Sequence, residues 1–560
     1  MARCSNPGES VELSNEGQEN QAAPTFYFDL SSSGFDQTEA IMRRPTPIRS
    51  TLTVFILLLC YAPSPAQTSA AGPLRFRITL GKELGQAASS GRLFVFMTDS
   101  PRAQQTLSIG FVPGSTWVAA MEVAHFPAGG TVEFDPERLA YPHPFSQANP
   151  GTYQVMALLD PNHSYPYHEQ DEGDLTSEVL KVENLNPANN APVQLTLTRR
   201  TPARFKPSDT DNVKLVEFQS KLLTEFWGRP IMMRAGVVLP PGYGPDSKRS
   251  YATVYHIHGF GGDHTGAWRQ AGMLTKAMTD GKQAEMIHIF LDGSFPTGHH
   301  EFADSVNNGP WGRALTTEFI PELERRFRLV SKPYARFLTG HSSGGWSTLW
   351  LQITYPDFFG GTWSTAPDPV DLHQFTGIDA TPGSTDNAYR TKDGKAKNLV
   401  RADGKDLVTT EEFAKQEEVI GEYGGQFASF EWVWSPRGED GRPMKMFNRE
   451  TGELNQEVLR YWQKYDIRLI LEQNWATLGP KLRGKINVIC GGADTFHLNE
   501  AVVLLCDFLK SKGSDAVCEI VPGRDHGNLY NPYETFPEGL SARIYKEMQA
   551  RFEAGAGAKK

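Results

Sequence analysis

The sequence predicts an α/β domain, with a mainly parallel sheet covered by helices on both faces, preceded by an all-β sandwich domain. Two observations predict this arrangement. From residue 73 to 200, short β-rich runs alternate with Gly, Pro and Asn turns without long helical periodicity, a pattern typical of β-sandwiches. From 210 to 553, near-continuous apolar runs alternate with amphipathic helices, which indicates a parallel sheet buried on both faces.

The N-terminal 66 residues are expected to lie outside both domains. Residues 1–41 are polar and aperiodic, and we expect a disordered extension or one that is not translated. Residues 42–66 have the order of a secretory signal peptide, with a basic start, an apolar run and a small-residue cleavage site at Ser64–Ala66. The sequence therefore predicts a protein that starts at Met42 and is secreted or periplasmic. An uncleaved membrane anchor is the alternative, although the apolar run is short for a membrane span.

Charge and length exclude some classes of partner and of fold. The chain of 560 residues is too long to fold around one hydrophobic core, so two or three domains are expected. Its formal net charge is −10 and it has no Lys/Arg-rich run, which argues against nucleic acid as a partner. After signal cleavage we expect no membrane partner either.

Three cysteines, Cys490, Cys506 and Cys518, would remain after signal cleavage. Three scattered cysteines do not make a disulfide framework, even in an oxidising compartment. Cys490 and Cys518 lie in apolar strand-like runs, where a buried, inert thiol is the default interpretation. The sequence leaves open one bridge that involves Cys506.

The elements of the two domains follow from the same patterns. In the β-domain the predicted strands are 91–99, 116–126, 151–160, 177–184 and 192–200. In the α/β domain they are 251–259, 284–293, 335–340, 360–366, 485–494 and 516–523. Helix 314–329 is marked by Leu315, Phe319, Leu323 and Phe327 at helical spacing.

A long insertion interrupts this alternation between about 372 and 480. It begins polar and turn-rich and ends with several aromatic residues. Because a structureless loop of this length is improbable, we expect a partly helical cap over the functional edge of the sheet.

The motif GHSSGG, residues 340–345, places Ser342 between a predicted strand and a predicted helix. A nucleophilic serine at such a turn has an unfavourable backbone, and its neighbours must lack side chains so that strand and helix pack closely. Gly340, Gly344 and Gly345 meet that need. The serine would also lie at a helix N-terminus, where the dipole favours developing negative charge. Ser342 is therefore predicted to be a nucleophile, and a small-residue packing loop is the alternative.

A serine hydroxyl needs a base, which a carboxylate must orient. His526 lies in the loop after the last apolar strand and is the predicted base. Asp494 lies just past a buried strand, 32 residues before His526, and is the predicted acid. Asp368 and Asp371 are its rivals, and so is Asp525, which is poorly placed to reach the neighbouring ring.

The tetrahedral intermediate of such a reaction needs two backbone N–H donors. One is expected from Ser343, directly after the nucleophile. The other is expected from Phe260 in HGFGG, the Gly-flanked turn that follows an earlier strand. These residues form the predicted oxyanion hole.

Several aromatic residues are candidates for a substrate pocket. Trp311 belongs to TGHHEFADSVNNGPWG, which we expect to line the pocket rather than to bind a metal, because adjacent histidines point in different directions and the spacing fits no common zinc pattern. Trp432 and Trp434 are expected either to form a platform for a sugar or phenolic ring or simply to pack in the cap.

Six stretches between about 213 and 550 together resemble one known family: FQSKLLTEFWGRPIMMRAGVVLPPGY, HIHGFGG, LTTEFIPELERRF, GHSSGGWSTL, GGADTF and GRDHGN. They are similar to the esterase D family of α/β-hydrolases, which includes enterochelin, feruloyl and acetyl-xylan esterases and S-formylglutathione hydrolases. The resemblance implies an α/β-hydrolase fold, Ser342, Asp494 and His526 as the triad, and Phe260 and Ser343 as the oxyanion hole. It also implies hydrolysis through an acyl-enzyme without a metal or an organic cofactor.

The sequence thus predicts an exported serine esterase that acts on a small-molecule or carbohydrate-linked ester. Two other functions are considered. An acyltransferase similar to the mycolyltransferases would use a sugar hydroxyl in place of water, and a non-catalytic protein would bind polysaccharide through its β-domain.

Overall fold

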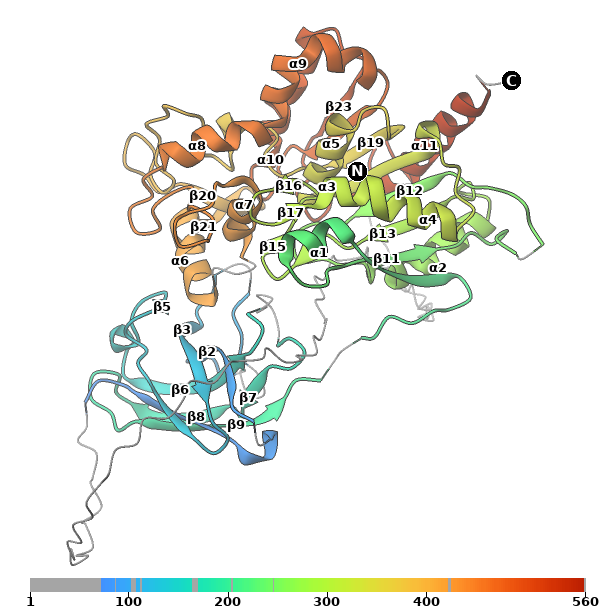
Figure 1. Ribbon diagram of the computed structural model, residues 1–560. Coiled ribbons are helices and arrows are strands. Elements are labelled where there is room, and N and C mark those ends of the chain that lie inside the picture. Colours follow the sequence, from blue (N-terminus) through green and yellow to red (C-terminus); the bar gives the residue numbers. More distant parts are fainter. Residues whose placement is uncertain are drawn as a thin grey trace, which may run out of the picture.

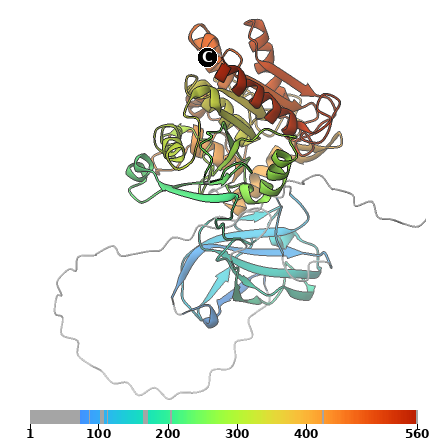
Figure 2. The ribbon, with the colours of Figure 1, turned by 90° about the vertical axis from the view of Figure 1, so that its right-hand side faces the viewer.

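The computed structural model describes residues 72–557, apart from 86, 102–106, 111–112, 164–169, 203–204, 245 and 422–424. The predicted extension and signal peptide, residues 1–66, lie outside the described residues. Figures 1 and 2 show two lobes, one formed by the first sheet and one by a larger sheet with its helices. Within the described ranges, no helix combines the length and the apolar character needed to cross a membrane.

The first lobe, blue to teal in Figure 1, is built from strands that form one nine-stranded sheet. The strand order is β4-β1-β9-β7-β6-β2-β3-β5, and β8 pairs with β6. The strands are β1 (Phe76–Leu80), β2 (Ser89–Thr98), β3 (Trp117–Phe126), β4 (Thr131–Phe134), β5 (Ala140–Tyr141), β6 (Gly151–Asp160), β7 (Leu175–Ser177), β8 (Leu180–Leu185) and β9 (Val193–Arg200). Four of the five predicted strands correspond to β2, β3, β6 and β9, and the predicted strand 177–184 is divided between β7 and β8.

Alternating side chains of this sheet meet in one core. Ile78 of β1 and Leu195 of β9 share a buried cluster with Leu93 of β2 and Val155 and Leu159 of β6. Because side chains of a strand point alternately to its two faces, the opposite face is left for a second contact, which is made with the insertion described below.

The second lobe contains an eight-stranded sheet of order β10-β11-β13-β12-β18-β19-β22-β23. β11 is antiparallel to both neighbours, and the strands from β13 to β23 are parallel. The strands are β10 (Val213–Gln219), β11 (Met232–Val238), β12 (Thr253–Ile257), β13 (Ile287–Leu291), β18 (Arg336–His341), β19 (Gly361–Thr365), β22 (Ile486–Gly491) and β23 (Val517–Val521). The six strands predicted for this domain are all present, whereas β10 and β11 were not among the predictions.

Helices cover both faces of the second sheet, as Figure 1 shows. The helices of the described residues, some of which belong to the insertion, are α1 (Lys221–Trp227), α2 (Gly266–Thr279), α3 (Trp311–Ala314), α4 (Ile320–Arg326), α5 (Ser343–Thr354), α6 (Thr410–Ile420), α7 (Gln426–Trp434), α8 (Gln456–Trp462), α9 (Ile467–Leu482), α10 (Leu498–Ser511) and α11 (Leu540–Gly557). Val254 and Phe337 share a core cluster with α2 and α11, and Tyr255 and Leu338 share another with α3 and α4. Adjacent residues of a strand therefore serve two different helix layers.

The predicted helix 314–329 is observed as α3, a π-helical turn at Leu315–Phe319 and α4. Leu315, Phe319 and Leu323 are buried, as the spacing predicted. The wide π turn directly precedes Pro321, which has no N–H to donate and whose ring would clash with the carbonyl four residues earlier. The proline thus accounts for the local departure from regular α-helix.

The insertion between β19 and β22 contains the hairpin β20 (Asn398–Ala402) and β21 (Lys405–Thr409), followed by helices α6 to α9. Arg401 of this hairpin donates to the carbonyl of Asp494 at 2.8 Å, which lies in the loop after β22. Ser429 of α7 bonds to both backbone groups of His299. The insertion therefore contacts the loops that follow two strands of the second sheet.

Two short pairs of strands also belong to the second lobe. β14 (Ser294–Phe295) pairs with β15 (Gly298–His299), and β16 (Asp304–Ser305) pairs with β17 (Gly309–Pro310).

Helix α6 also connects the insertion to the first sheet. Arg92 of β2 is 9% exposed and donates to the carbonyls of Glu418 and Val419, at the C-terminal end of α6. Val419 and Ile420 complete an apolar cluster with residues of β2, β3 and β6. The last carbonyls of a helix have no partner within the helix and carry the negative end of its dipole. Arg92 caps these carbonyls of α6, directly beside the apolar cluster.

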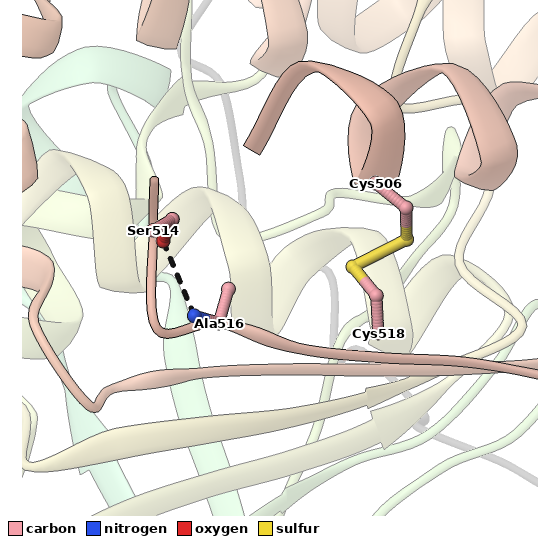
Figure 3. The surroundings of a disulfide bond; sticks show 4 residues. All are labelled: Cys506, Ser514, Ala516 and Cys518. Carbon is pink, nitrogen blue, oxygen red and sulfur yellow. Dashed lines mark hydrogen bonds between the residues drawn. A yellow bond between two sulfur atoms is a disulfide. The ribbon is translucent and has the colours of Figure 1, made fainter. Parts of the chain in front are cut away.

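A disulfide bond joins Cys506 of α10 to Cys518 of β23, with a Cα–Cα distance of 5.8 Å (Figure 3). The interpretation of Cys518 as an inert thiol is therefore wrong, because helix α10 brings a second cysteine against the strand. Cys490 is a buried free cysteine, as predicted.

Candidate active site

Ser342 lies in a strained turn between β18 and α5. Its backbone has φ 60° and ψ −126°, a conformation that a residue with a side chain adopts only at an energetic cost. Cβ atoms built on Gly340 and Gly345 would lie 2.3 Å from the carbonyl oxygen of Gly344 and 2.6 Å from that of Thr365. A Cβ on Gly344 would lie 2.0 Å from the carbonyl oxygen of Ile257. The three glycines are therefore required by close backbone contacts, as the sequence predicted.

The loop that follows β12 packs directly against this turn. A Cβ on Gly259 would lie 3.2 Å from Cβ and 3.8 Å from Oγ of Ser342. The structure therefore brings Gly259, the residue before the predicted oxyanion residue Phe260, next to the predicted nucleophile. Ser343, the other predicted oxyanion residue, is fully buried and is the first residue of α5, where backbone N–H groups have no partner within the helix.

His526 and Asp494 form a hydrogen-bonded pair. Nδ1 of His526 lies 2.8 Å from Oδ2 of Asp494, and Oδ1 of Asp494 accepts from the amides of Phe496 and Leu498 at 2.9 and 3.2 Å. Burial would raise the pKa of Asp494, but the His526 ring and these amides lower it below its usual value. Burial would lower the pKa of His526, but the charge of Asp494 raises it above 6.5. A carboxylate thus holds one side of the imidazole, with the other ring nitrogen left for a second partner.

The pair lies beside the strained turn. The ring of His526 is 4.4 Å from that of His341, the residue before Ser342. Oγ of Ser342 donates to Oδ1 of Asp368 at 3.4 Å, and among the described residues no hydrogen bond joins Ser342 to His526. Catalytic hydrogen bonds are often long before substrate binds and become shorter in the complex.

The rivals of Asp494 have other partners. Asp368 accepts from Oγ of Ser343 at 2.5 Å as well as from Ser342, and its burial raises its pKa to about 6. Asp371 pairs with Arg468 at 2.6 Å and with His373 at 2.7 Å. Both carboxylate oxygens of Asp525 are bonded to Asn528. Asp368 is thus a third polar group at the turn. The sequence named it as a rival for the acid, but its contact with Ser342 itself was not predicted.

The three predicted pocket tryptophans lie in different surroundings. Trp311 is 2% exposed and stacks on His300 with ring centroids 3.7 Å apart. Trp434 is 1% exposed and packs against Trp346 and Phe430. Trp432 is partly exposed and lines a cavity of about 1070 Å³ in the insertion. None of the residues that line this cavity is Ser342, Asp494 or His526, so in the described structure the cavity and the turn are separate features.

Part of the second lobe matches a known protein family. Residues 230–420 match the Esterase family model, which is described as "Putative esterase". A protein named "Endo-1,4-beta-xylanase/feruloyl esterase" from Xylanibacter ruminicola is 27% identical over 146 residues, which are 24% of this chain and 20% of that protein. The chain therefore matches about a fifth of the length of this curated relative.

Solved structures similar to this chain include esterases and a serine hydrolase. A ferulic acid esterase is 13% identical with a TM-score of 0.36, covering 61% of this chain and 97% of its own. The CE1 ferulic acid esterase of Anaeromyces mucronatus, in complex with ferulic acid, is 17% identical with a TM-score of 0.33, covering 62% and 94%. A fluorophosphonate-binding serine hydrolase of Staphylococcus aureus is 13% identical with a TM-score of 0.34, covering 61% and 98%.

The family match begins just before β11, includes the loop after β12 and the turn at Ser342, and ends within the insertion. This segment of the second lobe is therefore similar to the Esterase family.

Proposed function

We propose that this protein is a serine esterase that hydrolyses a carboxylic ester through an acyl-enzyme. The observation that carries the proposal is the buried Asp494–His526 pair, joined at 2.8 Å beside the strained turn of Ser342. A strained, glycine-flanked serine next to a histidine that a carboxylate orients has the parts of an activated nucleophile.

In the proposed reaction, Oγ of Ser342 attacks the ester carbonyl carbon and its proton passes to Nε2 of His526. Asp494 holds the other ring nitrogen and stabilises the imidazolium that forms. The tetrahedral intermediate collapses, its C–O bond to the alcohol breaks, and the alcohol leaves with the proton of His526. A water molecule then gives a proton to His526 and attacks the acyl carbon. The bond between this carbon and Oγ of Ser342 breaks, Oγ takes the proton from His526, and the acid is released.

The amides of Phe260 and Ser343 are the proposed oxyanion donors. Two observations support this role. Gly259, the residue before Phe260, packs against Ser342, and Ser343 is the first residue of α5. Donors at these positions need not move while charge develops on the carbonyl oxygen, and such preorganisation is usually the largest catalytic term.

The names of the relatives suggest the substrate class. We propose a small-molecule or carbohydrate-linked ester, with feruloyl esters as the first to be tested, because the sequence relative and two of the compared structures carry that name. Of the three predicted tryptophans, Trp432 is the one that is partly exposed, so it is the one proposed to contact the substrate.

The proposal extends to architecture and location. We propose that residues 73–200 are a β-sandwich domain and 210–553 the catalytic domain, with the cap-like insertion at 372–480. The shared core of β1, β9, β2 and β6 supports the sandwich. Export through the signal peptide 42–66 is proposed from the sequence alone, and a first residue Gln67 in the secreted protein would support it.

The test combines a covalent probe with a substrate screen. The protein is treated with a fluorophosphonate, digested, and the labelled peptide is identified by mass spectrometry, with heat-denatured protein as the control. An adduct on Ser342 and loss of methyl ferulate and p-nitrophenyl acetate hydrolysis in Ser342→Ala are expected. Full activity of a folded Ser342→Ala variant, or an adduct on another serine, would refute the mechanism.

A further inference from the structure

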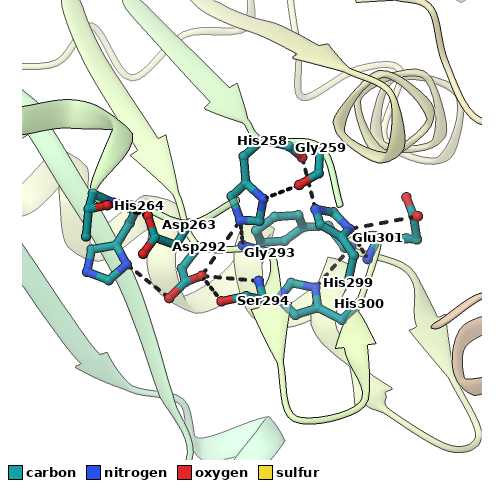
Figure 4. Close-up of polar contacts among 12 residues, drawn as sticks. His258, Gly259, Asp263, His264, Asp292, Gly293, Ser294, His299, His300 and Glu301 are labelled. Atoms are coloured by element: carbon teal, nitrogen blue, oxygen red, sulfur yellow. Dashed lines mark hydrogen bonds and ion pairs between the residues drawn. The ribbon is translucent and has the colours of Figure 1, made fainter. Parts of the chain in front are cut away.

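Two histidine rings hold the loop after β12 (Figure 4). Nδ1 of His258 lies 2.7 Å from the carbonyl oxygen of Gly259. Nε2 of His299, from the neighbouring hairpin, lies 3.1 Å from the carbonyl oxygen of His258. The rings pack edge to face with centroids 4.9 Å apart. Two consecutive carbonyls of the loop are therefore each bonded to an imidazole.

The other nitrogen of each ring faces a backbone N–H. Gly293 N donates to Nε2 of His258 at 2.8 Å, and this nitrogen also lies 3.7 Å from Oδ1 of Asp292. Glu301 N donates to Nδ1 of His299 at 3.1 Å. A ring nitrogen that accepts carries no proton, so the neutral ring of His299 has its proton on Nε2, which faces the carbonyl of His258. Burial, and next the nearby His258, lower the pKa of His299 well below its usual value, which keeps this ring neutral.

These bonds determine where the loop amides point. In a planar trans peptide the C=O and N–H groups point in opposite directions. Fixing the carbonyl of Gly259 therefore directs the N–H of Phe260 to the opposite side, and fixing the carbonyl of His258 does the same for the N–H of Gly259. Since Gly259 packs on Ser342, the loop as a whole is held against the nucleophile turn.

His299 is itself held by the insertion. Oγ of Ser429 in α7 accepts from the N–H of His299 at 2.9 Å and donates to its carbonyl at 3.0 Å. A Cβ on Gly298 would lie 2.7 Å from Cβ of Ser429, so the contact is close. A chain of hydrogen bonds thus runs from α7 through His299 to the loop that carries Phe260.

We propose that His299 is a positioning residue that holds the oxyanion loop in its productive orientation together with His258, and that Ser429 couples the insertion to this loop. The inference rests on the proposed function, because the loop amide matters to catalysis only if an oxyanion forms at Ser342. It gives the segment TGHHEF a role different from the predicted pocket lining: His299 and His300 are 2% and 0% exposed.

The kinetic test compares His299→Ala, His299→Gln and Ser429→Ala with the wild type on one ester. Because an oxyanion donor acts in the transition state, kcat should fall while KM changes little. Removal of a donor costs about 100- to 1,000-fold, so a misaimed donor in His299→Ala should cost about tenfold to a hundredfold. Gln carries an N–H donor near the position of Nε2 and should restore most of kcat. Ser429→Ala should show a smaller loss of the same kind.

His300→Ala is the matched control. His300 is adjacent and equally buried, but its ring accepts from the N–H of Phe302 and stacks on Trp311. The control should lose stability to a similar degree and keep kcat close to that of the wild type. If both variants lose kcat equally, the role of His299 is general packing and the inference is overturned.

A second measurement separates this inference from the proposed function. Hydrogen exchange of the amides of residues 256–262 is followed by mass spectrometry, which requires no catalysis. Faster exchange in His299→Ala and unchanged exchange in His300→Ala support the positioning role, even if the wild type hydrolyses no ester and the proposed function fails. Unchanged exchange in His299→Ala overturns the positioning role, even if the wild type is an active esterase.

Discussion

Nδ1 of His526 and Oδ2 of Asp494 lie 2.8 Å apart, and the carboxylate is 0% exposed. Each group stabilises the charged form of the other against the effect of burial. Burial raises the pKa of Asp494, yet the net shift is downward, and burial lowers the pKa of His526, yet the net shift is upward. The pair therefore has consequences for both activity and stability that depend on pH.

Activity on an ester should fall as pH decreases through the raised pKa of His526, because only the neutral imidazole accepts a proton. We expect the acid limb of kcat/KM above pH 6.5, the usual histidine value. Asp494→Asn should reduce kcat about 10⁴-fold by favouring the wrong tautomer. The measurement is a pH–rate profile of both proteins with a neutral substrate. If Asp371→Asn loses kcat instead of Asp494→Asn, the acid assignment is wrong.

The same pair should contribute to stability over a limited range of pH. The contribution of Asp494 is present above about pH 3.8, its unfolded value, and is lost as pH falls through the lowered folded pKa. That of His526 is present below pH 6.5 and is lost as pH rises through the raised folded pKa. Urea unfolding of wild type and Asp494→Asn should therefore differ most between pH 4 and 6.5. A difference independent of pH would contradict this linkage.

Asp368→Asn should gain stability relative to wild type as pH rises. The folded pKa of Asp368 is raised to about 6, so the folded state binds a proton more tightly than the unfolded chain. Wild-type stability then falls as pH rises from about 3.8 to 6, whereas the Asp368→Asn variant, which does not titrate at this position, shows no such loss. The check is the difference in Tm between the two proteins at pH 4.5 and pH 7.5. A difference that is equal at both pH values would show that Asp368 has an ordinary pKa.

Gly344→Ala should abolish activity and strongly destabilise the protein. The added Cβ would lie 2.0 Å from the carbonyl oxygen of Ile257, which belongs to the neighbouring strand and cannot move freely. Gly272→Ala is the matched control, since nothing lies within 4 Å of its Cβ in helix α2. The control should be more stable by about 0.5–1 kcal/mol, the helix advantage of Ala over Gly. Circular dichroism with denaturant measures both, and a fully stable Gly344→Ala would contradict the packing described.

Arg92→Ala should destabilise the contact between the first sheet and the insertion. Arg92 is 9% exposed and donates to Glu418 and Val419 in α6, so its loss leaves carbonyls unpaired, at a cost of about 1.5–3 kcal/mol. Arg77→Ala is the control, because Arg77 pairs with Glu133 on the surface, with side chains 42% and 67% exposed, and exposed pairs contribute about 0–1 kcal/mol. Equal losses in unfolding free energy would show that the contact with α6 is not stabilising.

The Cys506–Cys518 bridge should make stability sensitive to reductant. The bridged residues are 12 positions apart, and a closed loop of this size limits the unfolded chain by about 3 kcal/mol at most. Tm should fall on treatment with dithiothreitol and should be low in Cys506→Ser/Cys518→Ser with or without it. Mass analysis of the alkylated protein counts the thiols. A Tm that dithiothreitol does not change would argue against the bridge in solution.

Local pattern was sufficient for the parts of the site that lie on one continuous stretch. The glycine spacing around Ser342 predicted a turn whose geometry needs those glycines. In the structure, Gly344 lies against Ile257 at the end of β12, the strand that pairs with β18. The apolar runs predicted β12, β13, β18, β19, β22 and β23, because strands buried on both faces are apolar along their whole length. β10 and β11 were missed: β10 is an edge strand with mixed side chains, and β11 carries a polar Arg234 between apolar residues, so its pattern is less continuous than that of the parallel strands.

Contacts between distant segments could not be predicted in the same way. Tryptophans such as Trp311 and Trp434 are common in binding surfaces, but neighbours from other elements cover these two almost completely. Cys518 was interpreted from its own strand, whereas its partner comes from a helix. The contacts of Asp368, His299 and Ser429 with the site arise only when segments that follow different strands meet, so they could not be predicted from the sequence.

Spacing and polarity along short stretches were enough to predict the class of fold, the serine turn and the order of the candidate catalytic groups. The surroundings of these groups became known from the folded chain: the pairing of Asp494 with His526, the carboxyl of Asp368 at the serine, and the hydrogen bonds of His258 and His299 to the loop after β12. Hydrogen bonds and burial depend on distances between segments that are far apart in the chain, and packing sets those distances.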